Sequence, residues 1–204
     1  MELELKSKED LEHMRRAGQI VAEVLRRLQE EVRPGITTLE LDRIAEDMTR
    51  KRGAVPAFKG YRVGNRTFPA SLCVSINEEV VHGIPSTRTL RKGDIVGLDF
   101  GVVVDGYYGD AAVTVAVGDV TERAKHLIKA TLESLWAGIR TVQVGNRLGD
   151  LSHAIQIAAE EAGLSVVREF VGHGIGRHLH EEPQVPNFGD PGKGRLLREG
   201  MVLA

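Results

Sequence analysis

The 204-residue sequence has little cysteine, little net charge and no long apolar run. Its single cysteine, Cys73, cannot form an internal disulfide, which fits a reducing compartment. The net charge of -2 gives no electrostatic reason to expect binding to nucleic acid or to a membrane. No apolar run reaches the roughly 20 residues that span a bilayer, and the charged N-terminus lacks the apolar core of a signal peptide. A cytoplasmic protein is the expectation.

The composition itself is that of an ordinary globular domain, with 42% hydrophobic and 27% charged residues. Capping residues and apolar repeats at intervals of three and four predict four helices. The predicted helices begin after Ser7, after Thr37, near Thr121 and at Gly149. In the third, the repeat indicates an apolar face that includes Leu127, Leu132 and Leu135. Strands are predicted at 71–75 and 165–170.

The most informative feature is a D-G pair at 105–106 between two β-rich runs, which predicts a tight hairpin. With these two residues as the turn, Asp99 pairs with Ala112 and Asp110 pairs with Gly101. Asp99 and Asp110 then share one face of the hairpin as diagonal neighbours, about 7–8 Å apart at the backbone.

An aspartate in a hairpin is most often solvated on the open face, and for one aspartate that interpretation is favoured. Two on one face among apolar residues favour a metal site or an acid/base pair, because an unpaired buried carboxylate is costly. Carboxylates at this separation can both reach a pair of metal ions about 3.5–4 Å apart.

Two further segments carry aromatic or histidine side chains. Residues 54–70 read as an irregular loop with exposed aromatics, Phe58, Tyr61 and Phe68. A surface loop with some rings that cap the core is favoured over the alternative, the apolar wall of a pocket. His82 is followed by Gly83 and Pro85, which favour a loop that exposes the ring, and a lone histidine there is more often structural than chemical.

The segment 171–183 is rich in glycine and contains three histidines. Its glycines allow the backbone to approach another group closely. A phosphate loop is not supported, because no Lys-Ser/Thr pair follows. The histidines are candidate ligands of a metal or a substrate.

An internal repeat relates the two halves of the chain. Residues 90–97 resemble 197–204, and a His-Gly-Ile triplet lies upstream of each copy. Two helices precede each copy, so two similar halves are expected, with a site where they meet. The position that matches Asp99 would follow Ala204, and the sequence ends inside an apolar strand. We therefore expect a fragment cut before a second acidic ligand.

Four motifs together resemble type I methionine aminopeptidases: V-V-H-G-I-P-S (80–86), G-D-I-V-G-L-D-F-G (93–101), D-G-Y-Y-G-D (105–110) and the run from G-H-G-I-G-R to Q-V-P (172–186). The resemblance implies an α+β "pita-bread" fold, in which two pseudo-symmetric halves place helices on a curved antiparallel sheet. It also implies one metallo-aminopeptidase domain over 1–204, with its last strands missing. The family removes the initiator methionine of nascent proteins when the second residue is small.

The resemblance assigns Asp99 to one metal ion, Asp110 to both and His173 to the other. It implies two divalent ions, of Co, Mn, Fe or Zn, that activate a water. Two further glutamate ligands of the family are absent from these residues. We therefore expect weak or single-metal binding, little or no turnover and poor solubility from the sequence as it stands.

The resemblance also assigns the substrate contacts. His82 would bind the scissile amide nitrogen, and His180 would bind the substrate carbonyl and its developing oxyanion. Residues 62–67 look like an insertion, and His178, which stands where glycine is expected, should face solvent. The resemblance also implies that the protein is a monomer. Its substrates would be nascent polypeptides, which it would bind at the ribosome. The methionine side chain would lie among Phe58, Tyr61, Phe68, Cys73 and Leu179.

Two alternatives are kept open. An X-Pro aminopeptidase or dipeptidase of the same fold usually carries an extra N-terminal domain, whereas here the catalytic-type half begins almost at Met1. A non-catalytic binding module of the same fold would have lost the metal ligands, whereas Asp99, Asp110 and His173 are all present.

Overall fold

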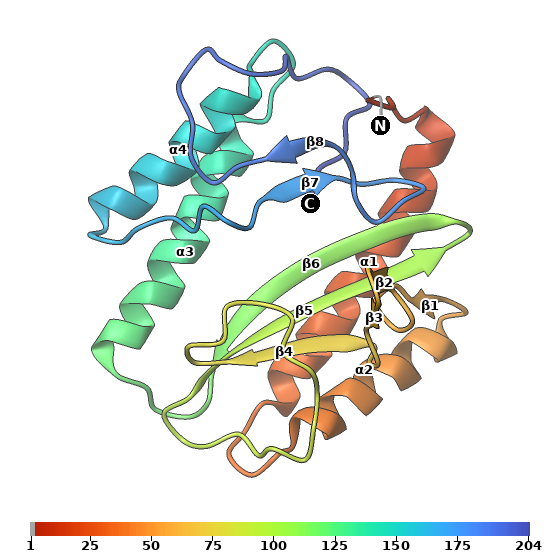
Figure 1. Ribbon diagram of the computed structural model, residues 1–204, viewed down its shortest axis with the longest axis vertical. Coiled ribbons are helices and arrows are strands. Elements are labelled where there is room, and N and C mark those ends of the chain that lie inside the picture. Colours follow the sequence, from red (N-terminus) through yellow and green to blue (C-terminus); the bar gives the residue numbers. More distant parts are fainter. Residues whose placement is uncertain (1–2) are drawn as a thin grey trace. The chain divides into compact units, whose positions relative to one another are not determined.

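The computed structural model describes residues 3–204, apart from the side chain of Val63 (Figure 1). The chain folds into two compact units. The hairpin unit comprises Glu12–Ala124, and the C-terminal unit runs from Lys125 to Ala204 and includes the N-terminal segment through Leu11. Each unit combines helices with antiparallel strands. Within the described part of the chain, no helix has both the length and the apolar character needed to cross a membrane.

The first two helices begin at the predicted caps. Helix α1 (Lys8–Glu31) starts after Ser7, whose hydroxyl accepts a hydrogen bond from the Asp10 N–H at 3.2 Å while Asp10 accepts from Ser7. Helix α2 (Thr38–Lys51) starts with the same reciprocal arrangement between Thr37 and Glu40. Each arrangement satisfies two backbone N–H groups that a helix start leaves unbonded.

The predicted hairpin is confirmed in its register. Strands β5 (Ile95–Val104) and β6 (Tyr107–Ala116) pair along their whole length. The turn residues Asp105 and Gly106 have φ angles of 52° and 82°, as a two-residue turn of this type requires. Strands β4 (Leu72–Ile76) and β1 (Val55–Pro56) pair with the other edge of β5, so β5 is the central strand of this sheet.

One face of this sheet packs on α1 and α2 and forms the core of the hairpin unit. Successive side chains along β5 point to opposite faces of the sheet, so every second residue enters this core. These residues are Val96, Leu98, Phe100 and Val102, each 0% exposed. Asp99 lies between two of these residues, so its side chain projects from the opposite face of the sheet.

The segment 54–70 is more ordered than the irregular loop that the sequence indicates. Besides β1, it contains strands β2 (Arg62–Val63) and β3 (Arg66–Thr67), which pair with each other across the residues expected to be an insertion. The sequence indicates an exposed Phe58, but its side chain is buried, with 8% of its surface accessible.

The C-terminal unit contains α3 (Glu122–Thr141), α4 (Leu148–Glu161), β7 (Gly172–Gly174) and β8 (Glu181–Val185). The two helices are as predicted, but the strand predicted at 165–170 is wrong. The Asn187 side-chain amide donates to the carbonyls of Val167 and Phe170, at 2.9 and 3.0 Å. These carbonyls are therefore bonded to a side chain, and the strand begins at Gly172.

The apolar face predicted for α3 is not its buried face. Leu127, Leu132 and Leu135 are 40–53% exposed, whereas the small residues Ala130, Ser134 and Gly138 are buried. A Cβ on Gly138 would lie 2.6 Å from Cγ1 of Ile155, so α4 packs directly against the small residues. Close packing between the helices therefore selects the face with the smallest side chains.

Matching hydrogen bonds support the internal repeat. In the hairpin unit, the Gly35 N–H donates to the Leu90 carbonyl at 2.8 Å. In the C-terminal unit, the Gly145 N–H donates to the Leu197 carbonyl at 3.3 Å. Both glycines have positive φ angles and precede the second helix of their unit. The two halves recognised in the sequence therefore share their local hydrogen bonding.

Candidate functional site

The two predicted carboxylate ligands lie on the same face of the hairpin unit's sheet. Asp99 pairs with Ala112 on β6 and with Cys73 on β4, and Asp110 pairs with Gly101. Both aspartates are partly buried, and Oδ1 of Asp110 is inaccessible to solvent. This is the diagonal placement predicted from the D-G turn, and it brings two negative charges close together.

Apolar side chains lie beside these carboxylates. A Cβ on Gly101 would be 3.0 Å from Cε1 of Phe58, so Phe58 covers the sheet two residues from Asp99 on the same face. The rings of Phe58 and Phe68 meet edge to face, with centroids 6.5 Å apart. Tyr61 is bonded into the same segment, because its N–H donates to the Phe58 carbonyl at 2.9 Å. Phe58 thus lies over the face of the sheet that bears Asp99, with the ring of Phe68 against it, and a pocket lined by these aromatic residues stays a prediction.

The Cys73 thiol is buried on this face. Burial raises its pKa far above the usual value, and the charges of Asp99 and Asp110 raise it further. The thiol therefore stays protonated through the pH range in which an ordinary cysteine ionises. We expect iodoacetamide at pH 9 to alkylate Cys73 in the metal-free folded chain at least about 100-fold more slowly than in urea. Equal rates in the two conditions, measured by mass spectrometry, would contradict this.

His82 is exposed, as predicted, and its backbone has a φ angle of 61°, which is uncommon for a residue other than glycine. The next residue holds the loop on β4: the Gly83 N–H donates to Ser75 Oγ at 3.2 Å, and its carbonyl accepts from Val74 at 2.9 Å. A Cβ on Gly83 would overlap the Val74 carbonyl. The loop therefore needs glycine there, and it presents His82 in a defined conformation.

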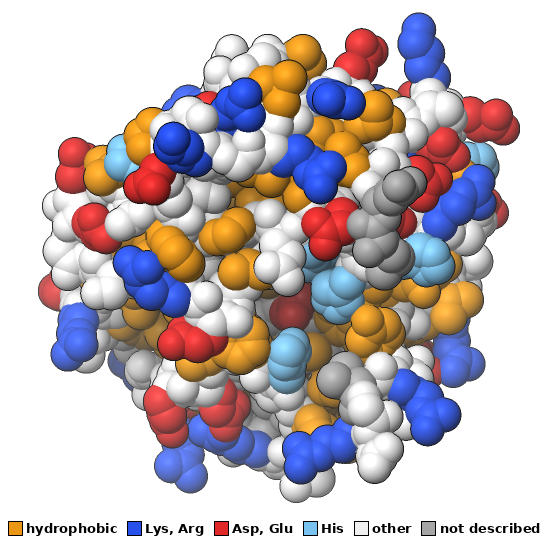
Figure 2. Space-filling view, turned by 45° about the horizontal axis from the view of Figure 1, so that its top comes forward, with side chains coloured by type: hydrophobic (Ala, Val, Ile, Leu, Met, Phe, Trp, Pro, Cys, Tyr) orange, Lys and Arg blue, Asp and Glu red, His pale blue; other side chains and the backbone are white. Residues whose placement is uncertain are grey.

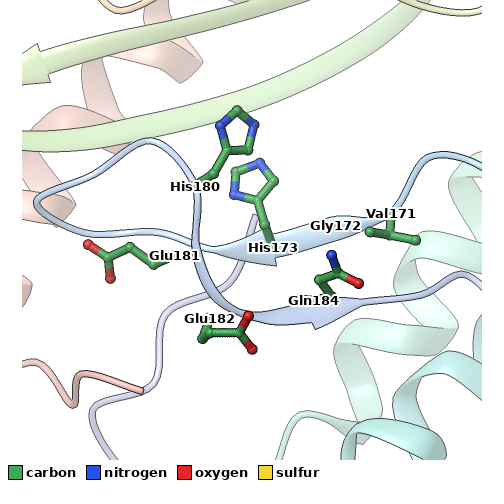
Figure 3. Close-up of a pocket in the computed structure, with 7 residues that line it drawn as sticks. All are labelled: Val171, Gly172, His173, His180, Glu181, Glu182 and Gln184. Carbon is green, nitrogen blue, oxygen red and sulfur yellow. The ribbon is translucent and has the colours of Figure 1, made fainter. Parts of the chain in front are cut away.

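The C-terminal unit contains a cavity of about 230 Å³ beside β7 and β8. In Figure 3, the rings of His173 and His180 lie against one another, and their centroids are 4.4 Å apart. Of the two histidines, His180 is exposed and His173 is half-buried. The cavity is lined by Val171, Gly172, His173, His180, Glu181, Glu182 and Gln184.

The backbone sets the orientation of His173. Its Nδ1 lies 3.0 Å from the carbonyl oxygen of Gly174, which can only accept a hydrogen bond, so Nδ1 carries a proton. The neutral ring then has its lone pair on Nε2, the nitrogen that can bind a metal ion. A Cβ on Gly174 would overlap the Glu182 carbonyl, so glycine is required at this bulge in the β7–β8 ladder.

The predicted site residues are divided between the units. His82, Asp99, Asp110 and the aromatic residues belong to the hairpin unit, and His173, Leu179 and His180 belong to the C-terminal unit. Leu179 is buried and His178 is exposed, as expected for a residue that faces solvent. Within the residues that the structure describes, no group of three or more His, Cys, Asp or Glu side chains is gathered in a way suited to hold a metal ion.

The sequence analysis overlooked several polar residues near these side chains. Ser71 and Ser75 lie on the same face of β4 as Cys73, and strand alternation applied to 71–75 would have found them. Glu182 and Gln184 line the cavity beside His173. The pairing of His173 with Gln184 depends on the register of β7 and β8, which no local pattern specifies.

Comparison with known proteins identifies the family. The model of metallopeptidase family M24 matches residues 12–204. A methionine aminopeptidase of Clostridium acetobutylicum is 52% identical over 201 residues, which cover 98% of this chain and 79% of that protein. The methionine aminopeptidase 1 of Bacillus subtilis is 49% identical over 199 residues, which cover 98% and 79%.

The fold comparison agrees. The crystal structure of the methionine aminopeptidase of Thermotoga maritima matches with a TM-score of 0.95 and 45% identity, over 99% of this chain and 80% of that one. The expected α+β pita-bread fold, built from helices and antiparallel sheets, is confirmed. The chain belongs to metallopeptidase family M24 and, within it, to the methionine aminopeptidases.

Proposed function

We propose that this chain is the main part of an enzyme that removes the N-terminal methionine from polypeptides whose second residue is small, and that Asp99, Asp110 and His173 are ligands of its two divalent metal ions. One observation carries the proposal: two carboxylates share one face of a sheet with an aromatic wall and a protonated thiol. Relatives named methionine aminopeptidase, 52% and 49% identical to this chain, support the same reaction.

The donor atoms suit divalent ions such as Co, Mn, Fe or Zn. Two carboxylates and an imidazole with its lone pair on Nε2 form a set of hard and intermediate ligands, without a thiolate. When bound, such ions would lower the pKa of a water to supply the nucleophile and would polarise the scissile carbonyl. Asp110, whose Oδ1 is buried, is proposed to bridge the two ions.

The histidines are proposed to stabilise charge and to hold the substrate. His180 would donate a hydrogen bond to the substrate carbonyl as its oxygen becomes negative, and the ring of His173, tilted by 56° against it, would limit its orientation. His82 would bind the scissile amide nitrogen from its exposed, conformationally fixed loop. Each histidine thus acts on an atom whose charge or bonding changes in the reaction.

The aromatic wall suits a methionine side chain. Phe58 and Phe68 offer ring edges and faces, with which a thioether sulfur makes favourable contacts. Cys73 adds a neutral, polarisable side chain on the same face. We propose that Tyr61 and Leu179 complete this pocket, and that the small space left beyond it restricts the second residue of the substrate.

The setting of the reaction is also a proposal. The single cysteine and the net charge of -2 support a cytoplasmic protein. In Figure 2, acidic and basic side chains are interspersed over the visible face, and neither sign forms a continuous patch. We propose a monomer that meets nascent chains at the ribosome, in which the two units act as one catalytic domain.

Replacing His180 by Ala is expected to lower kcat for a Met-Ala-Ser peptide by about 10²–10³-fold, because a donor to the developing oxyanion is lost. The matched control is His126→Ala, since His126 lies on α3 and its Nε2 bonds to the Ala162 carbonyl. The control should keep the parent kcat. An equal loss in both variants, or none in His180→Ala, would contradict the role of His180.

Substrate class is tested with three peptides, Met-Ala-Ser, Met-Leu-Ser and Gly-Pro-Ser, each with Mn²⁺, Co²⁺ or Fe²⁺. The assay uses the 204-residue chain and a chimera that adds the residues by which the Clostridium acetobutylicum relative is longer. We expect the chimera to release methionine from Met-Ala-Ser but little from Met-Leu-Ser, and the 204-residue chain to release little from either. Preferential cleavage of Gly-Pro-Ser would instead identify an X-Pro aminopeptidase.

A further inference from the structure

A buried ion pair lies close to the histidine cavity. Lys6 Nζ lies 2.7 Å from Oε2 of Glu181, and the two side chains are only 2% and 7% exposed. Lys6 also approaches Glu4 at 3.3 Å, but the Glu4 side chain is 55% exposed. Lysine and glutamate are seldom buried unless they are paired, and burying such a pair is itself costly.

The Glu181 carboxylate holds a turn as well as the lysine. Its Oε1 accepts a hydrogen bond from the His178 N–H at 2.9 Å. Burial acts to raise the pKa of Glu181, but the hydrogen bonds from Lys6 and His178 outweigh it and lower the pKa below its usual value. Glu181 is thus ionised at neutral pH, and it ties both ends of the turn 178–181 to Lys6.

The fold leaves room for Lys6 at two glycines. A Cβ on Gly176 would overlap Cε and Nζ of Lys6. A Cβ on Gly200 would be 2.7 Å from the Lys6 carbonyl oxygen, and the Lys6 N–H donates to the Gly200 carbonyl at 2.7 Å. Gly176 has no positive φ angle, so close approach of the lysine, rather than backbone conformation, explains glycine there.

The ion pair fixes the backbone on both sides of His180. Glu181 follows His180 directly and begins β8, where it pairs with Gly174 next to His173. Figure 3 shows the Glu181 carboxylate directed away from the two imidazole rings. The ion pair therefore acts on His180 through the main chain, whereas the ring of His173 contacts the His180 ring directly.

We propose that the Lys6–Glu181 ion pair positions His180 for the reaction, and that Lys6 is a positioning residue supplied by the N-terminal segment. The inference rests on the role proposed for His180. It gives the segment before α1 a direct connection to the proposed active site.

The first test needs no turnover. The ¹⁵N-labelled chain has seven histidines, and the ring signals of His180 can be assigned from their loss in His180→Ala. We expect Lys6→Met to shift the His180 ring signals more than those of any other histidine except His173 and His178, and Gly176→Ala to do the same by displacing Lys6. Glu4→Gln, which removes only the exposed partner, is the control and should change nothing. Unchanged His180 signals in Lys6→Met would overturn the proposal.

A second test separates positioning from folding. Lys6→Met/Glu181→Gln leaves no unpaired buried charge, so it should regain much of the thermal stability that Lys6→Met loses. The His180 shift should nevertheless persist in this double variant. If the His180 signals return to the parent positions together with stability, the ion pair serves folding alone and the proposal is wrong.

Kinetics then link the ion pair to the reaction. In the chimera, Lys6→Met should lower kcat for Met-Ala-Ser by roughly 10–100-fold, the usual range for a residue that orients an active-site group, with little change in KM. In the His180→Ala background the same substitution should have no further effect. Losses that multiply would overturn the positioning role. If His180→Ala itself keeps full activity, the role proposed for His180 fails instead, and the histidine signals still report on Lys6.

Discussion

Replacing Asp99 by Asn is expected to weaken Mn²⁺ binding by more than about 100-fold, since changes to groups that merely support a metal ligand already cost 10–100-fold. The substitution keeps the shape of the side chain and removes its charge. Asp99 and Asp110 lie together on one face of the sheet, where Asp99 would be a ligand of one ion and Asp110 a ligand of both. Isothermal titration of the metal-free chain with Mn²⁺ measures the effect.

The control for this prediction lies on the same hairpin. Asp105 occupies the turn with a φ angle of 52°, a conformation that asparagine adopts readily, and its carboxylate bonds to Arg16 at 3.0 Å. Asp105→Asn should therefore bind Mn²⁺ like the parent chain. Asp99→Asn should also fold normally, because it relieves repulsion between two carboxylates. Parent-like Mn²⁺ affinity in Asp99→Asn would remove Asp99 from the metal site.

Replacing the next residue, Phe100, by Ala is expected to destabilise the chain by roughly 3–5 kcal/mol, the usual cost of truncating a fully buried phenylalanine. The Phe100 side chain is 0% exposed and packs on α1 and α2, on the face opposite Asp99. The loss is a large part of the total stability of a typical domain, which is about 5–15 kcal/mol. Urea denaturation followed by circular dichroism measures it.

The comparison for Phe100→Ala is the same substitution at Phe170, which is 46% exposed. That variant should lose well under half as much stability, because its ring is only partly removed from water in the folded chain. Similar losses at the two positions would mean that the face of β5 bearing Phe100 is not the core. The two neighbouring substitutions should therefore have different effects: Asp99→Asn should weaken metal binding, and Phe100→Ala should lower the stability of the fold.

The sequence predicts best where the cause is local. The D-G turn at 105–106 sets the register of the hairpin, so the placement of Asp99 beside Asp110 could be derived from residue numbers alone. The caps at Ser7 and Thr37 likewise locate the starts of α1 and α2, because both partners of each capping box lie within four residues.

Prediction fails where a distant residue decides the outcome. The expected strand at 165–170 is absent because the amide of Asn187, 17 to 20 residues away, bonds to its carbonyls. Phe58 is buried because the segment 54–70 folds back on the sheet at Gly101. The Lys6–Glu181 pair joins residues 175 positions apart, which no periodicity or local motif can indicate.

The most direct test of this account is methionine release from Met-Ala-Ser by the chimera that carries the extra residues of the Clostridium acetobutylicum relative, after chelation and again after addition of Mn²⁺. The account predicts no release from the metal-free protein, release with Mn²⁺, and loss of that release in Asp99→Asn but not in Asp105→Asn. Release that is independent of metal, or that survives in Asp99→Asn, would contradict a metal-dependent reaction at this face of the sheet.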